Sequence, residues 1–489
     1  MNDFTQINPN DDVIIALRDC HKGEVIDGVT LLDDVKQGHK IALHDMAKGH
    51  LLIKYGNIIG ILSKDVKKGQ WIHSHNLVTS LNTANPHYLF QKSVVLPPKA
   101  STKTFMGYPR KDGRVGIRND LFIVPTVGCV NGSSNLIKAT FLKAHPEMMG
   151  HVQVLVHPYG CSQLGDDLAT TQRLLIGLAK NPDAGATLVV GLGCENNRLS
   201  SFMTAMEPYD HERVLSFQCQ DVEDDIAYGT ELLEKLYAKI KDEKRVSCPL
   251  SAITLGLKCG GSDGLSGLTA NPLVGLLSDA LGASGAKVAL TEVPEMFGAE
   301  QQLMNRAENQ EVFDKTVRLI ENFKAYYARN NQPCYENPSP GNKDGGITTL
   351  EEKSSGCVLK GGHLEIRDVI DVGQQITKPD LTLVNGPGND IVAATNLAAA
   401  GANLIVFTTG RGTPYGSVVP TIKIATNHLL AEKKPSWIDF DGEKCLDEGF
   451  EKAKDELLDL VIQVASGLET KEETHDMAQI ALFKTGVTL

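Results

Sequence analysis

Four cysteines follow short apolar runs of strand character and stand among glycines and polar residues. They are Cys129, Cys161, Cys194 and Cys259, in VGCVNG, YGCSQL, LGCENN and KCGGSDG. The intervals between them are 32, 33 and 65 residues, which match one, one and two units of a strand plus a crossover helix. If the strands lie parallel in one sheet, all four thiols meet at its carboxyl edge, where open α/β folds bind their ligands.

Thiolates that converge at a sheet edge could bind iron and leave a position open for substrate. Free cysteine is also among the most buried residue types, so the same residues could be small core residues below the edge. Carboxylates occur at the same kind of position and could form an oxygen cage for a divalent cation. Several of them could instead cap helices, a role that favours Asp and Asn.

The histidines gather in the amino-terminal part of the chain, at His39, His44, His73 and His75. Residues two apart in a strand point to the same face, so His73 and His75 are predicted to project together. Such a pair could ligate a metal or act as base and acid. Two surface histidines on a half-polar strand are the alternative interpretation.

Two glycine-rich loops carry a cation. GRGTPYG, residues 410–416, contains Arg411, and GNKDGG, residues 341–346, contains Lys343. Glycine amides beside a cation can cradle a carboxylate or a phosphate, although tight turns explain the glycines equally well. Neither loop has the spacing of a dinucleotide fingerprint or a Walker loop, so nucleotide binding has little support.

The elements that would position these groups change in character along the chain. Short apolar runs with glycine turns predict a small all-β module over residues 1–81, and Pro86, Pro97 and Pro98 predict an extended linker over 82–107. Beyond it, strands alternate with glycine turns and helix-length amphipathic segments, which is typical of an α/β fold with parallel sheets. We expect a middle domain over 108–247 and a carboxyl-terminal domain over 248–489.

The composition and charge of the chain argue against several classes of protein. The 489 residues carry a formal net charge of −12, which argues against a nucleic-acid binder. The sequence contains no apolar stretch of the roughly 18 residues that a membrane span needs, and its first residues lack the basic and apolar regions of a signal peptide. We therefore expect a cytoplasmic protein whose ten cysteines are not paired in disulfides.

Long motifs identify the chain as similar to the altronate/galactarate dehydratase family over essentially its whole length. The motifs are YGCSQLGDD, GLGCENN, CGGSDGLSG with TANP, TEVPEMFGAE, NPSPGNK with GGITTLE, and TTGRGTPYG. GHKIAL and IKYGNIIG resemble the β-clip (SAF-like) module of that family. The resemblance implies this module, a linker, a middle α/β domain involved in dimerisation, and a Rossmann-like carboxyl-terminal domain with a largely parallel sheet.

The resemblance also implies a reaction. It is the loss of water from D-altronate to give 2-dehydro-3-deoxy-D-gluconate, a step of hexuronate catabolism. YGCSQLGDD and TEVPEMFGAE favour altronate over galactarate or another hydroxy acid, and a non-catalytic sugar-acid binding protein is the weaker alternative. Fe2+ is the implied cofactor, with Mn2+ as a substitute ion and an iron–sulfur cluster as an alternative state of the iron.

We expect particular residues to carry out the steps of this reaction. We expect His73 and His75 to be base and acid, with His39 and His44 in reserve. We expect Arg411 and Lys343 to hold the substrate carboxylate together with Gly410, Gly412 and Thr413. For iron, the leading ligand set is Cys161, Cys194 and Cys259, and the oxygen alternative is Asp263, Glu292 and Glu295.

Overall fold

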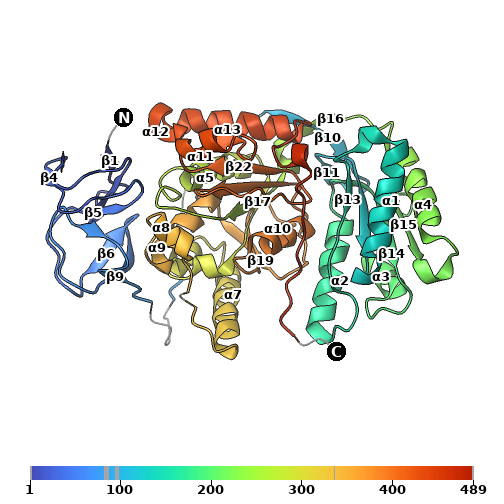
Figure 1. The fold of residues 1–489 in the computed structure, drawn as a ribbon, viewed down its shortest axis with the longest axis horizontal. Helices are drawn as coiled ribbons and strands as arrows, with labels where there is room; N and C mark the ends of the chain where they lie inside the picture. Colours follow the sequence, from blue (N-terminus) through green and yellow to red (C-terminus); the bar gives the residue numbers. More distant parts are fainter. Residues whose placement is uncertain (1–2, 82–87, 94–97, 335, 487–489) are drawn as a thin grey trace.

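The computed structural model describes residues 3–81, 88–93, 98–334 and 336–486. Its three bodies follow one another along the longest axis, with the β module at one end, the middle domain at the other and the carboxyl-terminal domain between them (Figure 1). Among the residues that are described, no helix has both the length and the apolar character needed to cross a bilayer.

The amino-terminal module is all β, as expected. Its main antiparallel sheet has the order β1-β2-β5-β8, a second sheet has the order β6-β7-β9, and β3 pairs with β4. The strands are β1 (Phe4–Thr5), β2 (Val13–Ala16), β3 (Val25–Ile26), β4 (Val29–Thr30), β5 (Lys40–Ala42), β6 (Leu51–Lys54), β7 (Asn57–Leu62), β8 (Trp71–Ile72) and β9 (Leu77–Val78). We refer to this unit, residues 3–81, as the β-clip.

A small antiparallel sheet joins the two larger domains. Its order is β11 (Val115–Gly116), β10 (Thr104–Pro109), β16 (Val246–Pro249). The segment expected to be a linker is therefore a strand from Thr104 onwards. Residues 82–87 and 94–97 of that segment lie outside the described residues, whereas 88–93 pack on the carboxyl-terminal domain, where the Ser93 amide donates to the Asn305 carbonyl at 2.7 Å.

The middle domain is a four-stranded parallel sheet of order β13-β12-β14-β15. Leu121 and Ile123 face one layer of helices, and Phe122 and Val124 face the other, as the alternation of a strand requires. The first layer contains α1 (Asn131–Ala144) and α4 (Asp225–Ile240), and the second contains α2 (Gly165–Ala179) and α3 (Leu199–Met206). The strands are β12 (Asp120–Pro125), β13 (Val152–Val154), β14 (Ala184–Gly191) and β15 (Val214–Gln218).

The carboxyl-terminal domain has a seven-stranded parallel sheet of order β19-β20-β18-β17-β21-β22-β23. The strands are β17 (Thr254–Cys259), β18 (Lys287–Leu290), β19 (Ile366–Ile370), β20 (Asp380–Val384), β21 (Leu404–Thr409), β22 (Thr421–Ala425) and β23 (Phe440–Asp441). Helices α5 and α13 cover one face, and α10, which itself packs on α2, covers the other. The α/β class and the parallel sheet are thereby confirmed.

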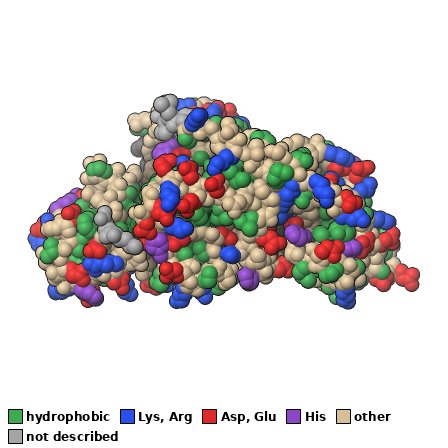
Figure 2. Space-filling model, turned by 90° about the horizontal axis from the view of Figure 1, so that it is seen from above, with side chains coloured by type: hydrophobic (Ala, Val, Ile, Leu, Met, Phe, Trp, Pro, Cys, Tyr) green, Lys and Arg blue, Asp and Glu red, His purple; other side chains and the backbone are tan. Residues whose placement is uncertain are grey.

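The helices of this domain are α5 (Ala270–Ala283), α6 (Glu300–Met304), α7 (Gln310–Arg329), α8 (Pro340–Asp344), α9 (Leu350–Cys357), α10 (Asp390–Ala399), α11 (His428–Lys433), α12 (Lys444–Glu448) and α13 (Phe450–Ala465). Outside, acidic and basic side chains are interspersed over the face drawn in Figure 2, with hydrophobic side chains scattered between them. Among the coloured residues of that face, Lys and Arg side chains form no continuous stripe.

Glycine backbones form the contact between the β-clip and the carboxyl-terminal domain. The Gly264 amide donates to the Gly345 carbonyl at 2.7 Å, and both residues lie against Gly38. A Cβ at Gly264 would overlap the Gly38 carbonyl oxygen, and one at Gly346 would lie 2.7 Å from it. We call this contact of Gly38, Gly264, Gly345 and Gly346 the glycine seam, because no side chain fits within it.

A buried ion cluster lies beside the seam. The ammonium groups of Lys40 and Lys54 both lie 2.8 Å from the Glu352 carboxylate of α9, and each side chain is at most 1% exposed. Burial opposes the charge of Glu352, but the two ammonium groups outweigh it and lower the pKa of that carboxyl to about 2. Burial lowers the pKa of Lys40 to about 8. These contacts fix the β-clip on the larger domain.

Candidate active site

Beside these contacts, a cavity of about 640 Å³ lies between the β-clip and the carboxyl-terminal domain. We call it the cleft. His39, Trp71 and His73 line it from the β-clip, and Arg411 lines it from the loop after β21. Lys343 and Asp344 line it from the end of α8, a short helix where the sequence predicted a glycine-rich loop. Four residues predicted to carry the chemistry, from widely separated parts of the chain, therefore face one space.

The two cleft histidines have defined hydrogen-bond partners. His39 Nδ1 accepts a hydrogen bond from the Trp71 indole at 3.1 Å, and its Nε2 lies 3.3 Å from the Asp344 carbonyl. His73 Nε2 lies 2.8 Å from the Lys343 carbonyl, and its Nδ1 lies 3.0 Å from the Ser74 hydroxyl. Because a carbonyl only accepts, these partners assign the proton of each neutral ring to Nε2.

Both imidazoles are held in their neutral form. Burial, followed by the nearby Lys40 charge, lowers the pKa of His39 to about 4. Burial also lowers the pKa of His73. Near pH 7 both rings can therefore accept a proton, which is the state a general base requires.

The depressed pKa of His39 predicts a pH dependence of stability. Its imidazole is protonated below about pH 6.5 in the unfolded chain but only near pH 4 in the fold. The stability that His39 contributes is thus fully present above pH 6.5 and lost as the pH falls through that window, by about 3 kcal/mol. Urea unfolding of the wild type and His39→Gln should show their difference in unfolding free energy shrinking by this amount from pH 7 to pH 4. A constant difference would contradict the assignment.

The other two predicted histidines lie elsewhere. Strand β8 ends at Ile72 and the chain turns at once, with the Asn76 amide donating to the His73 carbonyl at 3.0 Å. The prediction that His73 and His75 share a strand face is therefore wrong; His75 is exposed, with its ring 4.9 Å from that of Trp71. His44 lies outside the cleft lining, 3.2 Å from the Asp12 carboxylate.

Arg411 is the member of its loop that faces the cleft. It is exposed, Lys343 is half-buried, and neither is in a salt bridge with a described residue. The other predicted loop residues shape the turn: the Gly412 amide donates to Thr409 Oγ1 at 2.8 Å, and Thr413 Oγ1 accepts from the Tyr415 amide at 3.2 Å. Gly410 packs so closely on Asp263 that a Cβ would overlap its carboxyl group.

Matches to known proteins cover the same three bodies. The descriptions of the matching family models are "Altronate/galactarate dehydratase SAF domain" for residues 2–80, "D-galactarate dehydratase/Altronate hydrolase, second domain" for 107–241, and "D-galactarate/Altronate dehydratase, C-terminal" for 250–488. The altronate dehydratase of Bacillus subtilis is 46% identical over 100% of both chains. The chain belongs to the D-galactarate/altronate dehydratase family.

Two further relatives are dehydratases of Escherichia coli. Its altronate dehydratase is 45% identical over 99% of the chain and 100% of the relative. Its galactarate dehydratase (L-threo-forming) is 34% identical over 90% of the chain and 88% of the relative. The first match spans essentially the whole of both chains, and the second spans most of each.

The expected oxygen ligands for iron do not form one group. Asp263 is buried and accepts hydrogen bonds from Thr426, Ser266 and Asn427, which bind the loop after β17 to the residues after β22. Glu292 and Glu295 lie instead below the strand ends, around Cys259. The Cys259 amide donates to Glu292 at 3.2 Å, and its thiol lies 3.0 Å from Glu295.

This buried group is already balanced in charge. Cys259, Glu295 and Cys357 present ligand-type atoms within 4.8 Å of one another, but the Lys360 ammonium lies 2.9 Å from the Cys259 sulfur and that of Lys353 lies 2.9 Å from Glu295. The hydrogen bond with Cys357, together with Lys360, lowers the pKa of Cys259 to about 6. Two ammonium groups stand where a divalent cation would bind, so the group does not fit iron(II).

The three cysteines expected to bind iron lie in two different domains. Cys161 and Cys194 follow β13 and β14 of the middle sheet, whereas Cys259 ends β17 of the other sheet and is buried. The expectation that all four cysteine-bearing strands share one sheet is therefore wrong. The interval of 65 residues contains β15, α4 and β16, so it crosses from one domain to the next.

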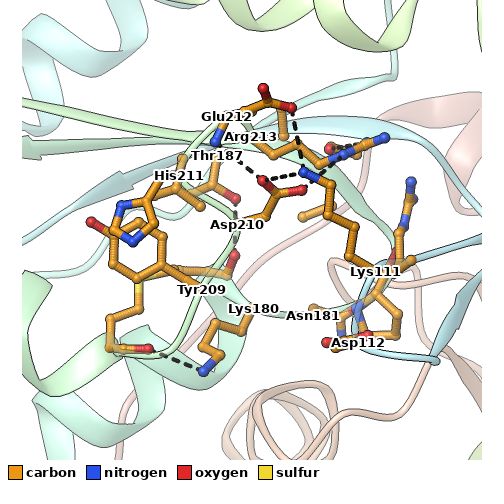
Figure 3. Close-up of a pocket in the computed structure, with 18 of the residues that line it drawn as sticks. Lys111, Asp112, Lys180, Asn181, Thr187, Tyr209, Asp210, His211, Glu212 and Arg213 are labelled. Carbon is orange, nitrogen blue, oxygen red and sulfur yellow. Dashed lines mark hydrogen bonds and ion pairs between the residues drawn. The ribbon is translucent and has the colours of Figure 1, made fainter.

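A second hollow lies at the amino ends of β14 and β15, with a volume of about 610 Å³. Figure 3 shows its charged side chains paired with one another: Lys111 lies 3.0 Å from Asp210 and 3.3 Å from Glu212. Lys180 donates to the Pro208 carbonyl at 2.7 Å. The hollow contains none of the predicted site residues and lies at the sheet edge opposite to the one where α/β folds bind ligands.

Proposed function

We propose that the protein dehydrates D-altronate to 2-dehydro-3-deoxy-D-gluconate in the cleft. Two altronate dehydratases are 46% and 45% identical to it over essentially the whole chain. The observation that carries the location is the convergence of two neutral imidazoles from the β-clip and two cations from the carboxyl-terminal domain on one cavity.

The cations answer the main difficulty of the reaction. Removing the C2 proton of an aldonate places a second negative charge beside the carboxylate, so positive groups must share that charge. Arg411 and Lys343 hold the carboxylate and stabilise the enediolate that forms next to it. Neither cation is engaged by a salt bridge to a described residue, so both are available to the substrate.

One cleft histidine can carry both proton transfers. His73 is the proposed base, because its Nδ1 faces only the hydroxyl of Ser74, whereas His39 Nδ1 is held by the Trp71 indole. The imidazolium that His73 becomes then returns a proton to the departing C3 hydroxyl, which leaves as water, while His39 keeps its Nε2 proton in the hydrogen bond to the Asp344 carbonyl. The enol that remains becomes the keto acid without further help from the protein.

The charges of the cleft favour a substrate with one carboxylate. Asp19 and Asp34 line the cleft from the β-clip, together with His21 and Lys36. Altronate ends in a neutral hydroxymethyl group, whereas galactarate carries a second carboxylate that would meet these acids. Like charges at short range are unfavourable, so a second carboxylate placed near Asp19 and Asp34 is expected to weaken binding.

A substrate comparison tests this function. Protein kept anaerobic with Fe2+ and thiol should convert D-altronate to the 3-deoxy-2-keto acid, measured by mass spectrometry, with a higher kcat/KM than for galactarate. A preference for galactarate would overturn the substrate assignment. Tight altronate binding without turnover would instead indicate a non-catalytic binding protein.

Replacing Arg411 tests the anchoring role. Arg411→Ala removes a charge-assisted hydrogen bond worth about 1.5–3 kcal/mol, so KM for altronate should rise about 10- to 100-fold. A fall in kcat as well would show that the guanidinium also acts in the transition state. Arg318→Ala, at an exposed position of α7, is the matched control and should leave both constants unchanged; an unchanged KM for Arg411→Ala would exclude the anchor.

The remaining expectations are part of the proposal. They are a requirement for Fe2+, with Mn2+ as a substitute, a homodimer, and a cytoplasmic location. Light scattering of the purified protein tests the dimer, since a mass of twice 52.9 kDa is expected. For iron, the described residues of the cleft supply no group of three ligand atoms, so no step of the dehydration is assigned to the ion.

A further inference from the structure

We propose that Cys129, Cys161 and Cys194 bind an iron–sulfur cluster at the carboxyl edge of the middle sheet, outside the cleft. These three cysteines are exposed, and the other seven in the chain are buried or half-buried. Free cysteine is ordinarily among the most buried residue types. The exposure of three thiols at one edge of a sheet therefore indicates that they bind a ligand.

The topology brings the three thiols together. Cys161, Cys129 and Cys194 follow β13, β12 and β14, which are consecutive strands of the sheet. Neighbouring strands lie about 4.8 Å apart, so the three loops start side by side. A glycine precedes each cysteine, at Gly128, Gly160 and Gly193.

Hydrogen bonds join the loops next to the cysteines themselves. The Gly128 amide donates to the Tyr159 carbonyl at 2.8 Å, and the Asn197 amide donates to the Gly160 carbonyl at 2.9 Å. Gly160 has φ of 100° and packs on Thr126 so closely that a Cβ would overlap the Thr126 carbonyl. The loops are thus fixed relative to one another before any ligand binds, which lowers the entropic cost of binding.

The arrangement of the three sulfurs does not fit a single ion. The three sulfurs are not among the groups of described residues whose ligand atoms all lie within 4.8 Å of one another, as ligands of one ion would. Cysteines of a cluster each bind a different iron, so the cluster itself separates them. Glu195, beside Cys194, accepts from Thr126 at 2.7 Å and the Gly193 amide at 2.6 Å, and so serves the loop instead of a metal.

The fourth strand of the sheet ends differently. Cys219 follows β15 directly, but it is half-buried and packs against the domain core. Three exposed cysteines therefore follow the strands at this edge, which matches the number of protein ligands of a [4Fe–4S] cluster with one iron lacking a cysteine ligand. Unlike Cys259, none of the three receives a hydrogen bond from a lysine among the described residues.

The site is separate from the proposed dehydration. In Figure 1 the β-clip and the middle domain lie at opposite ends of the molecule, so within one chain the cluster does not reach the cleft. The inference rests on the cysteines alone. Turnover of altronate would stand if no cluster formed, and a cluster would stand if the protein acted on another acid.

Anaerobic reconstitution with iron, sulfide and thiol tests the proposal. The wild type should take up about four iron atoms and four sulfides per chain, with thiolate-to-iron absorption in the visible and iron–iron scattering in the X-ray absorption spectrum. Cys129→Ser, Cys161→Ser and Cys194→Ser should each lose most of this iron, whereas Cys219→Ser should retain it.

Each other outcome overturns the proposal. Iron bound without sulfide or iron–iron scattering would exclude a cluster, and full iron content in all three variants would exclude these ligands. Equal loss in Cys219→Ser would exclude the assignment of three ligands. Because the wild-type spectrum needs no variant, the test holds even if a substitution disturbs folding.

Discussion

Replacing Glu352 with Gln is expected to lower the free energy of unfolding by about 3–5 kcal/mol. The substitution keeps the shape of the side chain but leaves Lys40 and Lys54, both fully buried, without a counter-charge. Uncompensated ammonium groups in a low-dielectric interior are costly. Urea unfolding at pH 7, followed by circular dichroism, measures the loss.

A surface glutamate provides the matched control. Glu432→Gln, at an exposed position of α11, should change the unfolding free energy by no more than about 0.5 kcal/mol. Replacing Lys40 and Lys54 with Met in the Glu352→Gln background should recover part of the loss, because no buried charge remains. A loss below 1 kcal/mol for Glu352→Gln alone would show that the cluster is not what fixes the β-clip.

Replacing His73 with Asn is expected to lower kcat for altronate by about 10²- to 10⁴-fold, the usual contribution of a general base. Burial lowers the pKa of this ring, so the acid limb of the wild-type kcat/KM profile should lie below pH 6.5, and the variant should lack it. Steady-state kinetics from pH 4.5 to 8 measure both effects.

The control for this variant is His211→Asn, which changes an exposed histidine of the middle domain. Its turnover should match that of the wild type. Unchanged turnover in a folded His73→Asn protein would exclude His73 as the base. A loss of rate with the acid limb still present would transfer the role to another group, and His39 is next in line because it lines the same cleft.

The sequence indicated the fold class and half of the site for identifiable reasons. Parallel strands end in glycine turns at regular intervals, and this pattern located the loops that carry Arg411 and the cysteines. It could not show that β17 belongs to a different sheet, because the join depends on β10 pairing with β16 across more than a hundred residues. Chain intervals alone do not distinguish one large sheet from two smaller ones.

Other features had no signal in the sequence. His73 and His75 have strand spacing, but β8 stops one residue too early for that spacing to apply. Lys40 and Lys54 look like ordinary strand lysines, and their partner Glu352 lies about three hundred residues away. Burial of a charge is a property of the assembled domains, so it cannot be deduced from a local pattern.

At the glycine seam, contact between main chains sets the distance between the β-clip and the carboxyl-terminal domain, and therefore the width of the cleft. The two backbones touch there with no side chain between them. Substituting residues elsewhere in the lining of the cleft therefore changes the polarity of the cleft without changing its width. Enzymes built on this frame can therefore diverge in the acids they prefer while the gap that receives the carbon chain keeps its dimensions. Preference among hydroxy acids of equal length becomes a matter of surface chemistry, and it can evolve without architectural change.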